Sequence, residues 1–272
     1  MNKIILFLQK SVLFRWLLYL FTTIGSNVIV FNSAVGRFCN FAVKMLSSAF
    51  SRGFFLRNFL NSLFVNGFCS IPVVGLTGVF VGAVLTLQLF ISLRMFGIEN
   101  TIPYIVLFAL MKELAPVLCG LMVVSRVGSS MSAEIGSMAT NNQLDVLKSM
   151  SINKYKFLFF PRVLSMTVSQ PILTTIAVIT GVIGSFVVAT RMFGFTDRYF
   201  CNLIYEGFEW QAYRVCFVKG LIFGFMISII ACYKGDKTNN GAVGIKNTTI
   251  STVVLCCVYI LIANFVITWL MG

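Results

Sequence analysis

Two adjacent charged residues, Lys112 and Glu113, lie inside an apolar run that extends over residues 102–124. In a membrane-spanning helix each would cost at least about 2.5–3.5 kcal/mol on insertion scales, so such residues normally face a partner or a water-filled cavity. Two interpretations remain open. The residues could form a structural pair that neutralises itself or bonds a neighbouring span, or they could line a polar or amphipathic cavity.

The chain contains few residues that could act as general bases, nucleophiles or metal ligands. The chain contains no histidine, the commonest general base. Its eight cysteines are scattered without a CxxC pair, so neither a zinc nor a haem site is expected. We interpret the cysteines as small buried hydrophobic residues and predict no catalytic residue, no metal site and no cofactor bound by this chain.

The composition predicts that these residues lie in an integral membrane protein. Hydrophobic residues make up 58% of the chain and charged residues 11%, whereas a soluble domain carries about 25% charged residues. The net charge of +13 forms no basic stripe interleaved with aromatic residues, so we expect no nucleic-acid partner. The basic residues cluster at span ends and in particular loops, which indicates membrane topology and contact with anionic lipid.

Five apolar stretches are long enough to cross a bilayer, which takes about 20 residues. They run approximately over 64–93, 102–124, 159–189, 215–233 and 250–271. Proline at positions 116 and 171 falls inside two of them, where it should kink the helix or mark a packed polar site.

The apolar stretch 12–31 contains Arg15 and is ambiguous. If it lies flat on the inner face, every basic residue before Phe59 stays in the cytoplasm, as the positive-inside bias prefers. We therefore predict an all-α integral membrane protein with an N-terminal interfacial (elbow) region at 1–63 and a transmembrane domain at 64–272. With the N-terminus inside, the loops at 126–158 and 234–247 are expected to be cytoplasmic.

A polar, helix-compatible stretch at 126–150 separates the second span from the third. It is too polar for hydrocarbon, yet Met131, Ile135 and Met138 recur at helical spacing. We predict a cytoplasmic helix that a partner contacts. The chain has no GxxxxGK[ST] phosphate loop, and its spans lack the acidic series of a proton relay. Energy for any transport would therefore come from that partner.

The first span carries two patterns of side-chain size. Gly75, Gly78 and Gly82 provide small residues for close helix packing, either within the chain or against a second copy. The outer half carries a stripe of large apolar residues with one amide. Facing bulk lipid, the stripe would be unremarkable; facing a cavity, it would suit an acyl chain better than a sugar or an ion. Its members are Leu85, Gln88, Leu89, Leu93 and Phe96.

Several short motifs follow one another along the chain from about Gly67 onward. They are Gly78-Val79-Phe80-x-Gly82 ending in Gln88, Lys112-Glu113-Leu114-x-Pro116-Val117, Arg126-Val127-Gly128, Ala133-Glu134-Ile135-Gly136-x-Met138, Gln143-Leu144-Asp145-x-Leu147, Pro161-Arg162 and Gly241-Ala242-x-Gly244-Ile245. In this combination and order they resemble the MlaE permease family of ABC lipid transporters. Lys112 departs from the pattern, because the family usually has arginine there.

The resemblance implies a multi-pass permease of the bacterial inner membrane that works as a homodimer. Its partners would be two copies of an ABC ATPase subunit, which uses the ATP, and commonly MCE-domain substrate-binding proteins on the outer side. Such complexes move phospholipids between the inner membrane and the periplasm, in support of the outer membrane.

The resemblance also implies roles for individual residues. The segment at 126–150 would hold the coupling helix that docks on the ATPase, with Arg126, Glu134, Ile135, Gly136 and Met138. The stripe from Leu85 to Phe96, together with Lys112 and Glu113, would lie near a lipid cavity at the dimer axis.

Two rival functions remain. A self-sufficient secondary transporter or channel would place Lys112 and Glu113 in its pathway, but the inverted repeats it predicts are not visible in the sequence. A membrane-embedded enzyme of lipid metabolism would have little to work with, because there is no histidine and few carboxylates lie in or near the spans.

Overall fold

The structure is a computed structural model that describes residues 25, 29, 32–33, 35–47, 56–239 and 241–271. The chain divides into two compact units, Met1–Ser47 and Ser48–Gly272. Residues 35–47 of the first unit are helical. Most of the interfacial helix expected at 12–31 lies outside the described residues, and the predicted domain boundary at 63/64 stays a prediction.

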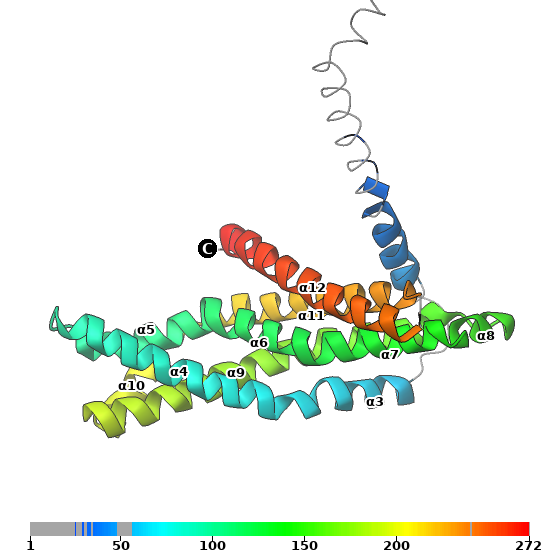
Figure 1. Cartoon of the computed structure of the whole chain (residues 1–272). Helices are drawn as coiled ribbons and strands as arrows, with labels where there is room; N and C mark the ends of the chain where they lie inside the picture. The colour runs from blue at the N-terminus through cyan, green and yellow to red at the C-terminus, as the bar shows by residue number, and fades with distance from the viewer. Residues whose placement is uncertain are drawn as a thin grey trace, which may run out of the picture. The chain divides into compact units, whose positions relative to one another are not determined.

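The second unit is helical, and none of the described residues belongs to a strand, which confirms the all-α architecture. Figure 1 labels its helices. They are α3 (Leu56–Asn66), α4 (Ile71–Arg94), α5 (Ile102–Ala109), α6 (Ala115–Val123), α7 (Ser129–Thr140), α8 (Gln143–Ser149), α9 (Phe160–Phe193), α10 (Asp197–Glu206), α11 (Trp210–Asp236) and α12 (Gly241–Met271).

Five segments of the described chain are long and apolar enough to cross a membrane. Each predicted span lies inside one of them, so the five-span expectation is confirmed. The segments are Leu56–Arg94, Glu99–Thr140, Tyr155–Phe193, Trp210–Asp236 and Gly241–Met271. The second continues to Thr140, so the first part of the polar stretch extends a spanning helix instead of starting a separate one.

Proline and π-helical turns divide the long segments. Pro116 lies in the first turn of α6, directly after a π-helical turn at Leu110–Leu114, and its missing N–H leaves the carbonyl of Lys112 without the usual i→i−4 donor. A second π-helical turn, Val124–Gly128, joins α6 to α7. Inside α9, the carbonyl of Pro171 accepts hydrogen bonds from the hydroxyls of Thr174 and Thr175. π-Helical turns are rare and frequently occur at functional sites.

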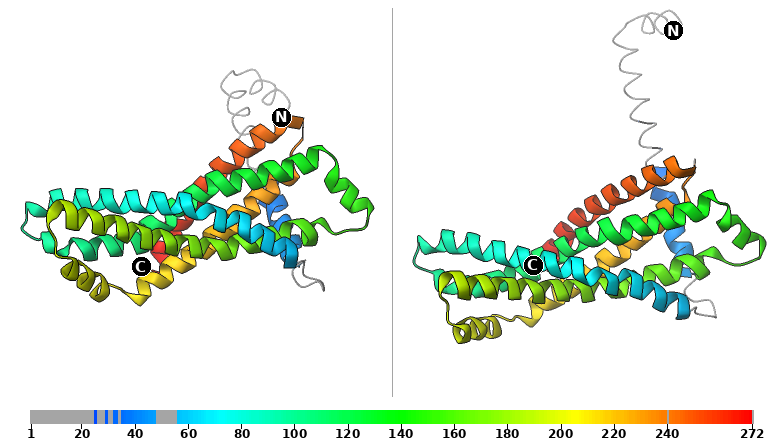
Figure 2. Two further views of the ribbon diagram at one scale, coloured as in Figure 1. Left: turned by 90° about the horizontal axis from the view of Figure 1, so that it is seen from below. Right: turned by 60° about the horizontal axis from the view of Figure 1, so that its bottom comes forward.

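α4 and α9 run side by side along much of their length (Figure 2), and glycines permit their close approach. A Cβ on Gly82 would lie 1.8 Å from the carbonyl oxygen of Gly181, and one on Gly78 would lie 2.2 Å from Oγ1 of Thr180. At Gly75 the nearest atom would be 3.7 Å away, an ordinary van der Waals distance. Gly78 and Gly82 thus permit close packing within the chain, whereas Gly75 is not needed for it.

The bundle has two distinct ends. Figure 1 shows α8 at one end and the turn between α4 and α5 at the other. Between them, α11 packs against α7, α9 and α12. It is the most enclosed of the five spans, since 67% of the residues in its apolar stretch are buried. It therefore forms the centre against which polar side chains of neighbouring spans can be held.

Candidate functional site

A cluster of polar side chains joins three spans inside the membrane segment. Glu113 accepts hydrogen bonds from Nδ2 of Asn264 at 2.8 Å and from Oγ1 of Thr268 at 2.9 Å, both on α12. On α11, Nζ of Lys219 lies 3.1 Å from Oε1 of Glu113. The Lys219 side chain is fully buried, whereas that of Glu113 is 38% exposed. The cluster compensates two charges that would be costly alone in hydrocarbon.

The π-helical turn at Leu110–Leu114 shapes this cluster. Nζ of Lys219 also donates to the carbonyl oxygen of Lys112 at 2.7 Å and to Oγ1 of Thr268 at 2.8 Å. The carbonyl of Lys112 is available because Pro116, four residues later, has no N–H that could donate to it. All three donor positions of the ammonium are thereby used, which lets the charge stay buried.

Lys112 has a different environment from its neighbour. Its ammonium lies 5.0 Å from the ring centroid of Phe108, in cation–π geometry. Among the described residues Lys112 forms no ion pair, and Glu113 pairs with Lys219 instead. Sequence neighbours on a helix point in different directions, so Lys112 and Glu113 do not neutralise each other directly.

One face of α7 belongs to the protein core. Ile135 is fully buried, and a Cβ added to Gly235 of α11 would lie 2.7 Å from its Cβ. Gly136 is also buried, because its backbone comes close to the hydroxyl of Thr238. Met138 is partly buried. Ile135 and Gly136 thus fix α7 to the spans and are not part of the exposed surface.

The opposite face of α7 carries an ion pair. Oε1 of Glu134 lies 2.6 Å from Nη2 of Arg162, close to the start of α9. The Glu134 side chain is 55% exposed, and that of Arg162 is 13% exposed. A small polar cavity of about 120 Å³ between α3, α7 and α9 borders the pair. The pair connects the second and third spans at the α8 end of the bundle.

Arg126 lies in the π-helical turn Val124–Gly128. Its Nη1 is buried and has no hydrogen-bond partner among the described residues. Most buried guanidinium nitrogens have an acceptor, so Arg126 is an exception among the described residues.

The turn after α7 presents α8 at the end of the bundle. Asn142 adopts a left-handed backbone conformation with φ 57°, which asparagine tolerates better than most residues. α8 buries Leu144 but leaves Val146 54% exposed, and Met150 directly after it is 64% exposed. These two apolar side chains are open to contact with another surface.

The apolar stripe of α4 divides between two environments. Leu85, Leu89 and Leu93 are partly buried against Ile102, Val106 and Leu110. Gln88 and Phe96 are exposed, Phe96 by 76%. The leucines therefore pack α4 against the second span, and Gln88 and Phe96 are the exposed members of the stripe.

Comparison with known proteins identifies the family of this chain. The family model described as Permease MlaE matches residues 59–270. The chain belongs to the MlaE permease family. A probable ABC transporter permease of Rickettsia conorii is 37% identical over 246 residues, which cover 90% of this chain and 95% of the relative. Another, from Synechocystis, is 34% identical over 215 residues, covering 79% of this chain and 82% of the relative.

A further relative is the chloroplastic protein TRIGALACTOSYLDIACYLGLYCEROL 1 of Arabidopsis thaliana. It is 30% identical over 212 residues, which cover 78% of this chain and 61% of the relative. As an MlaE permease with five spanning segments, the chain is a multi-pass membrane protein and a transporter subunit.

Several residues around Glu113 and Glu134 of this MlaE permease were not predicted from the sequence as site residues. Lys219 stands alone in an apolar run, and the cost that drew attention to Lys112 predicts a buried carboxylate partner for it as well. Asn264 and Thr268 gave no comparable signal, because uncharged polar residues are common in spans. Arg162 appeared as a motif residue, but its partner is 28 positions away.

Proposed function

We propose that this MlaE permease is the membrane subunit of an ABC transporter that moves phospholipids between the inner membrane and the periplasm of a bacterium. A separate ATPase subunit supplies the energy. The observation that carries the proposal is that α7 and α8 end the second span as a polar helix pair, with Val146 and Met150 exposed for a partner. The relatives named as ABC transporter permeases support an ATPase as that partner.

The cargo is inferred from three features. The relative from Arabidopsis is named after a lipid with a diacylglycerol body. The permease itself is apolar, with a mean hydropathy of +0.92. Near the partly exposed Glu113, the cationic Lys112 could attract a phosphate while the surrounding spans accept acyl chains. We place the cargo pathway at this cluster, on a dimer axis formed with a second copy, with MCE-domain proteins receiving or delivering lipid outside.

The mechanism we propose is mechanical. ATP binding and hydrolysis would change the separation of the two α7–α8 pairs in the dimer, and the movement would open or compress the lipid cavity. Within one subunit, α7 contacts α11 and α12 and continues into α6 through the π-helical turn, so a displacement reaches both elements that hold Glu113.

Reconstitution tests the proposal. The permease and its ATPase are placed in proteoliposomes, and movement of a fluorescent phospholipid is followed with ATP, with a non-hydrolysable analogue and without the ATPase. We expect transfer only with ATP and both subunits. Equal transfer by the permease alone would contradict the proposal, and an ion flux that Glu113→Gln abolishes would favour the secondary transporter or channel.

A further inference from the structure

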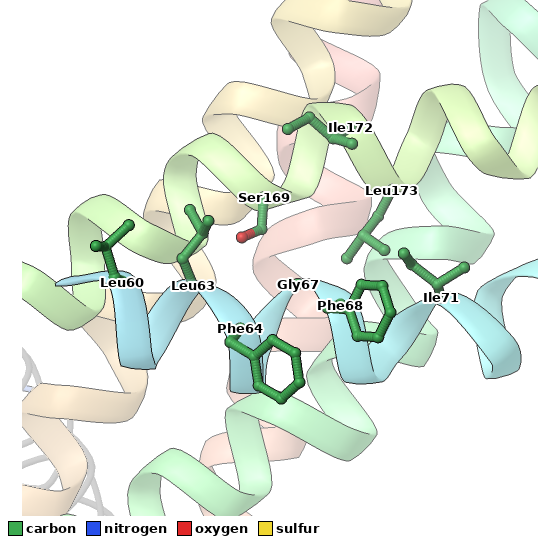
Figure 3. A pocket seen from close by; sticks show the side chains of 9 residues that line it. All are labelled: Leu60, Leu63, Phe64, Gly67, Phe68, Ile71, Ser169, Ile172 and Leu173. Atoms are coloured by element: carbon green, nitrogen blue, oxygen red, sulfur yellow. The ribbon is translucent and has the colours of Figure 1, made fainter. Parts of the chain in front are cut away.

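A hydrophobic groove lies on the surface of the bundle where α3 and α4 cross α9 (Figure 3). Its volume is about 370 Å³, and its lining includes the buried residues Gly67, Ser169 and Leu173. A Cβ on Gly67 would come within 2.8 Å of Oγ of Ser169, so the glycine lets α3 approach α9 closely. The groove is distinct from the cluster around Glu113, and none of its lining residues belongs to that cluster.

The groove follows from a break in the first span. The 3-10 turn Phe68–Ser70 separates α3 from α4, and Pro72 follows in the first turn of α4. The hydroxyl of Ser70 donates to the carbonyl oxygen of Asn66 at 2.7 Å, and Nδ2 of Asn66 donates to Oγ of Ser165 at 3.1 Å. These buried hydrogen bonds hold the break against α9, so the groove is a fixed feature of the fold.

The groove offers hydrocarbon contacts and no free polar group. Phe64 and Phe68 stack with ring centroids 5.2 Å apart and are 55% and 63% exposed, and Ile172 opposite them is 53% exposed. The Ser169 hydroxyl is already used, because it donates to the carbonyl oxygen of Ser165 at 2.7 Å. A sugar or peptide in the groove would leave its polar groups without partners, whereas an acyl chain has none to satisfy.

The length of the groove corresponds to one leaflet. From Leu60 to Ile71 the helices rise by about 16 Å at 1.5 Å per residue. Half of a bilayer's hydrocarbon core is about 15 Å thick. One acyl chain of the leaflet on the α7–α8 side therefore matches the groove better than a helix that crosses the whole membrane.

A positive charge marks the polar end of the groove. Arg57 is exposed and precedes Leu60 by three residues and Phe64 by seven, so all three share a face of α3. We propose that the groove binds one anionic phospholipid, with an acyl chain along Phe64 and Phe68 and its phosphate at Arg57. This lipid would sit on the outer surface of the bundle, and the inference does not depend on what the protein transports.

Tryptophan quenching tests the inference on the full chain in vesicles. Trp16, Trp210 and Trp269 are replaced by phenylalanine, and Phe64→Trp then reports on the groove. The matched control is Phe80→Trp on α4, since Phe80 is 62% exposed and does not line the groove. For each reporter, quenching by brominated phosphatidylglycerol is compared with quenching by brominated phosphatidylcholine at equal mole fraction, which cancels differences in depth.

We expect an approximately fivefold preference for phosphatidylglycerol at position 64, as for one basic residue near an anionic surface, and a ratio near one at position 80. Arg57→Gln should abolish the preference and Arg57→Lys should keep it, with unchanged thermal melting in both. Equal ratios at the two reporters would overturn the proposal, and so would a preference that survives Arg57→Gln. A Phe64→Trp reporter that neither lipid quenches would also overturn it, because a protein segment would then cover the groove.

Discussion

Lys219 of α11 and Glu113 of the second span form an ion pair 3.1 Å long in which the ammonium is fully buried and the carboxylate is partly open. This asymmetry decides which partner can be removed. Without Glu113 the ammonium would be left buried and uncompensated, whereas without Lys219 the carboxylate would keep its bonds to Asn264 and Thr268.

Stability measurements test this asymmetry. Glu113→Gln should lower the free energy of unfolding by about 3 kcal/mol or more, the range for breaking a buried pair. Lys219→Met should cost less, and the double variant should be more stable than Glu113→Gln alone. Thermal melting in detergent checks the order. Additive losses in the double variant would show that the two side chains are not coupled.

Glycine packing between α4 and α9 gives a second prediction. Gly82→Ala should destabilise the protein by more than about 3 kcal/mol, because the new methyl group would meet the backbone of Gly181 and not a movable side chain. Gly75→Ala on the same helix is the control and should be tolerated, since its nearest neighbour is 3.7 Å away. Similar melting temperatures for the two variants would mean that α4 and α9 are farther apart than described.

The divided stripe of α4 predicts two kinds of variant. Leu85→Ala should cost about 2 kcal/mol in unfolding free energy through lost contact with the second span. Gln88→Ala should change it by less than about 0.5 kcal/mol, because the amide is exposed. If the lipid cavity lies at this face, Gln88→Trp should reduce lipid transfer at unchanged melting temperature. Full transfer by Gln88→Trp would place the cavity elsewhere.

The ion pair between Glu134 and Arg162 should matter more for coupling than for stability. Glu134→Gln should change the unfolding free energy by at most about 1 kcal/mol, since the carboxylate is half exposed. In the complex with the ATPase we expect it to reduce the stimulation of ATP turnover several-fold. The exchanged variant Glu134→Arg with Arg162→Glu should recover part of it. Unaltered turnover in Glu134→Gln would remove this pair from the coupling path.

Membrane orientation can be tested with the chain's own cysteines. Cys201 of α10 is exposed near the end of the bundle opposite α8. A variant that keeps only Cys201 should react with a membrane-impermeant maleimide in intact spheroplasts. In a cysteine-free background, Ser149→Cys on α8 should react only after permeabilisation. The reverse pattern would place α7 and α8 outside and contradict the expected orientation.

The spans were predictable because apolar length alone decides them. The sequence predicts a helix in the polar stretch at 126–150, but it does not predict that this helix continues from α6. A helix end at Arg126 and a π-helical turn there cannot be distinguished from the sequence. Partners such as Lys219 for Glu113 and Arg162 for Glu134 depend on how spans pack, which hydropathy does not encode. The division of the α4 stripe into packed and exposed residues has the same cause. Helical spacing shows that these residues share one face of α4, but it does not show which of them another helix covers.

The second segment, Glu99–Thr140, continues from one end of the bundle to the other as a series of helical turns without an intervening loop. Its 42 residues form a helical segment about 60 Å long, in which the two π-helical turns depart from regular α-helix. A displacement of the helix end at Thr140 is therefore transmitted to Glu113 through helix and not through a flexible loop. The stiffness of this helical segment therefore determines how much of a displacement at Thr140 reaches Glu113.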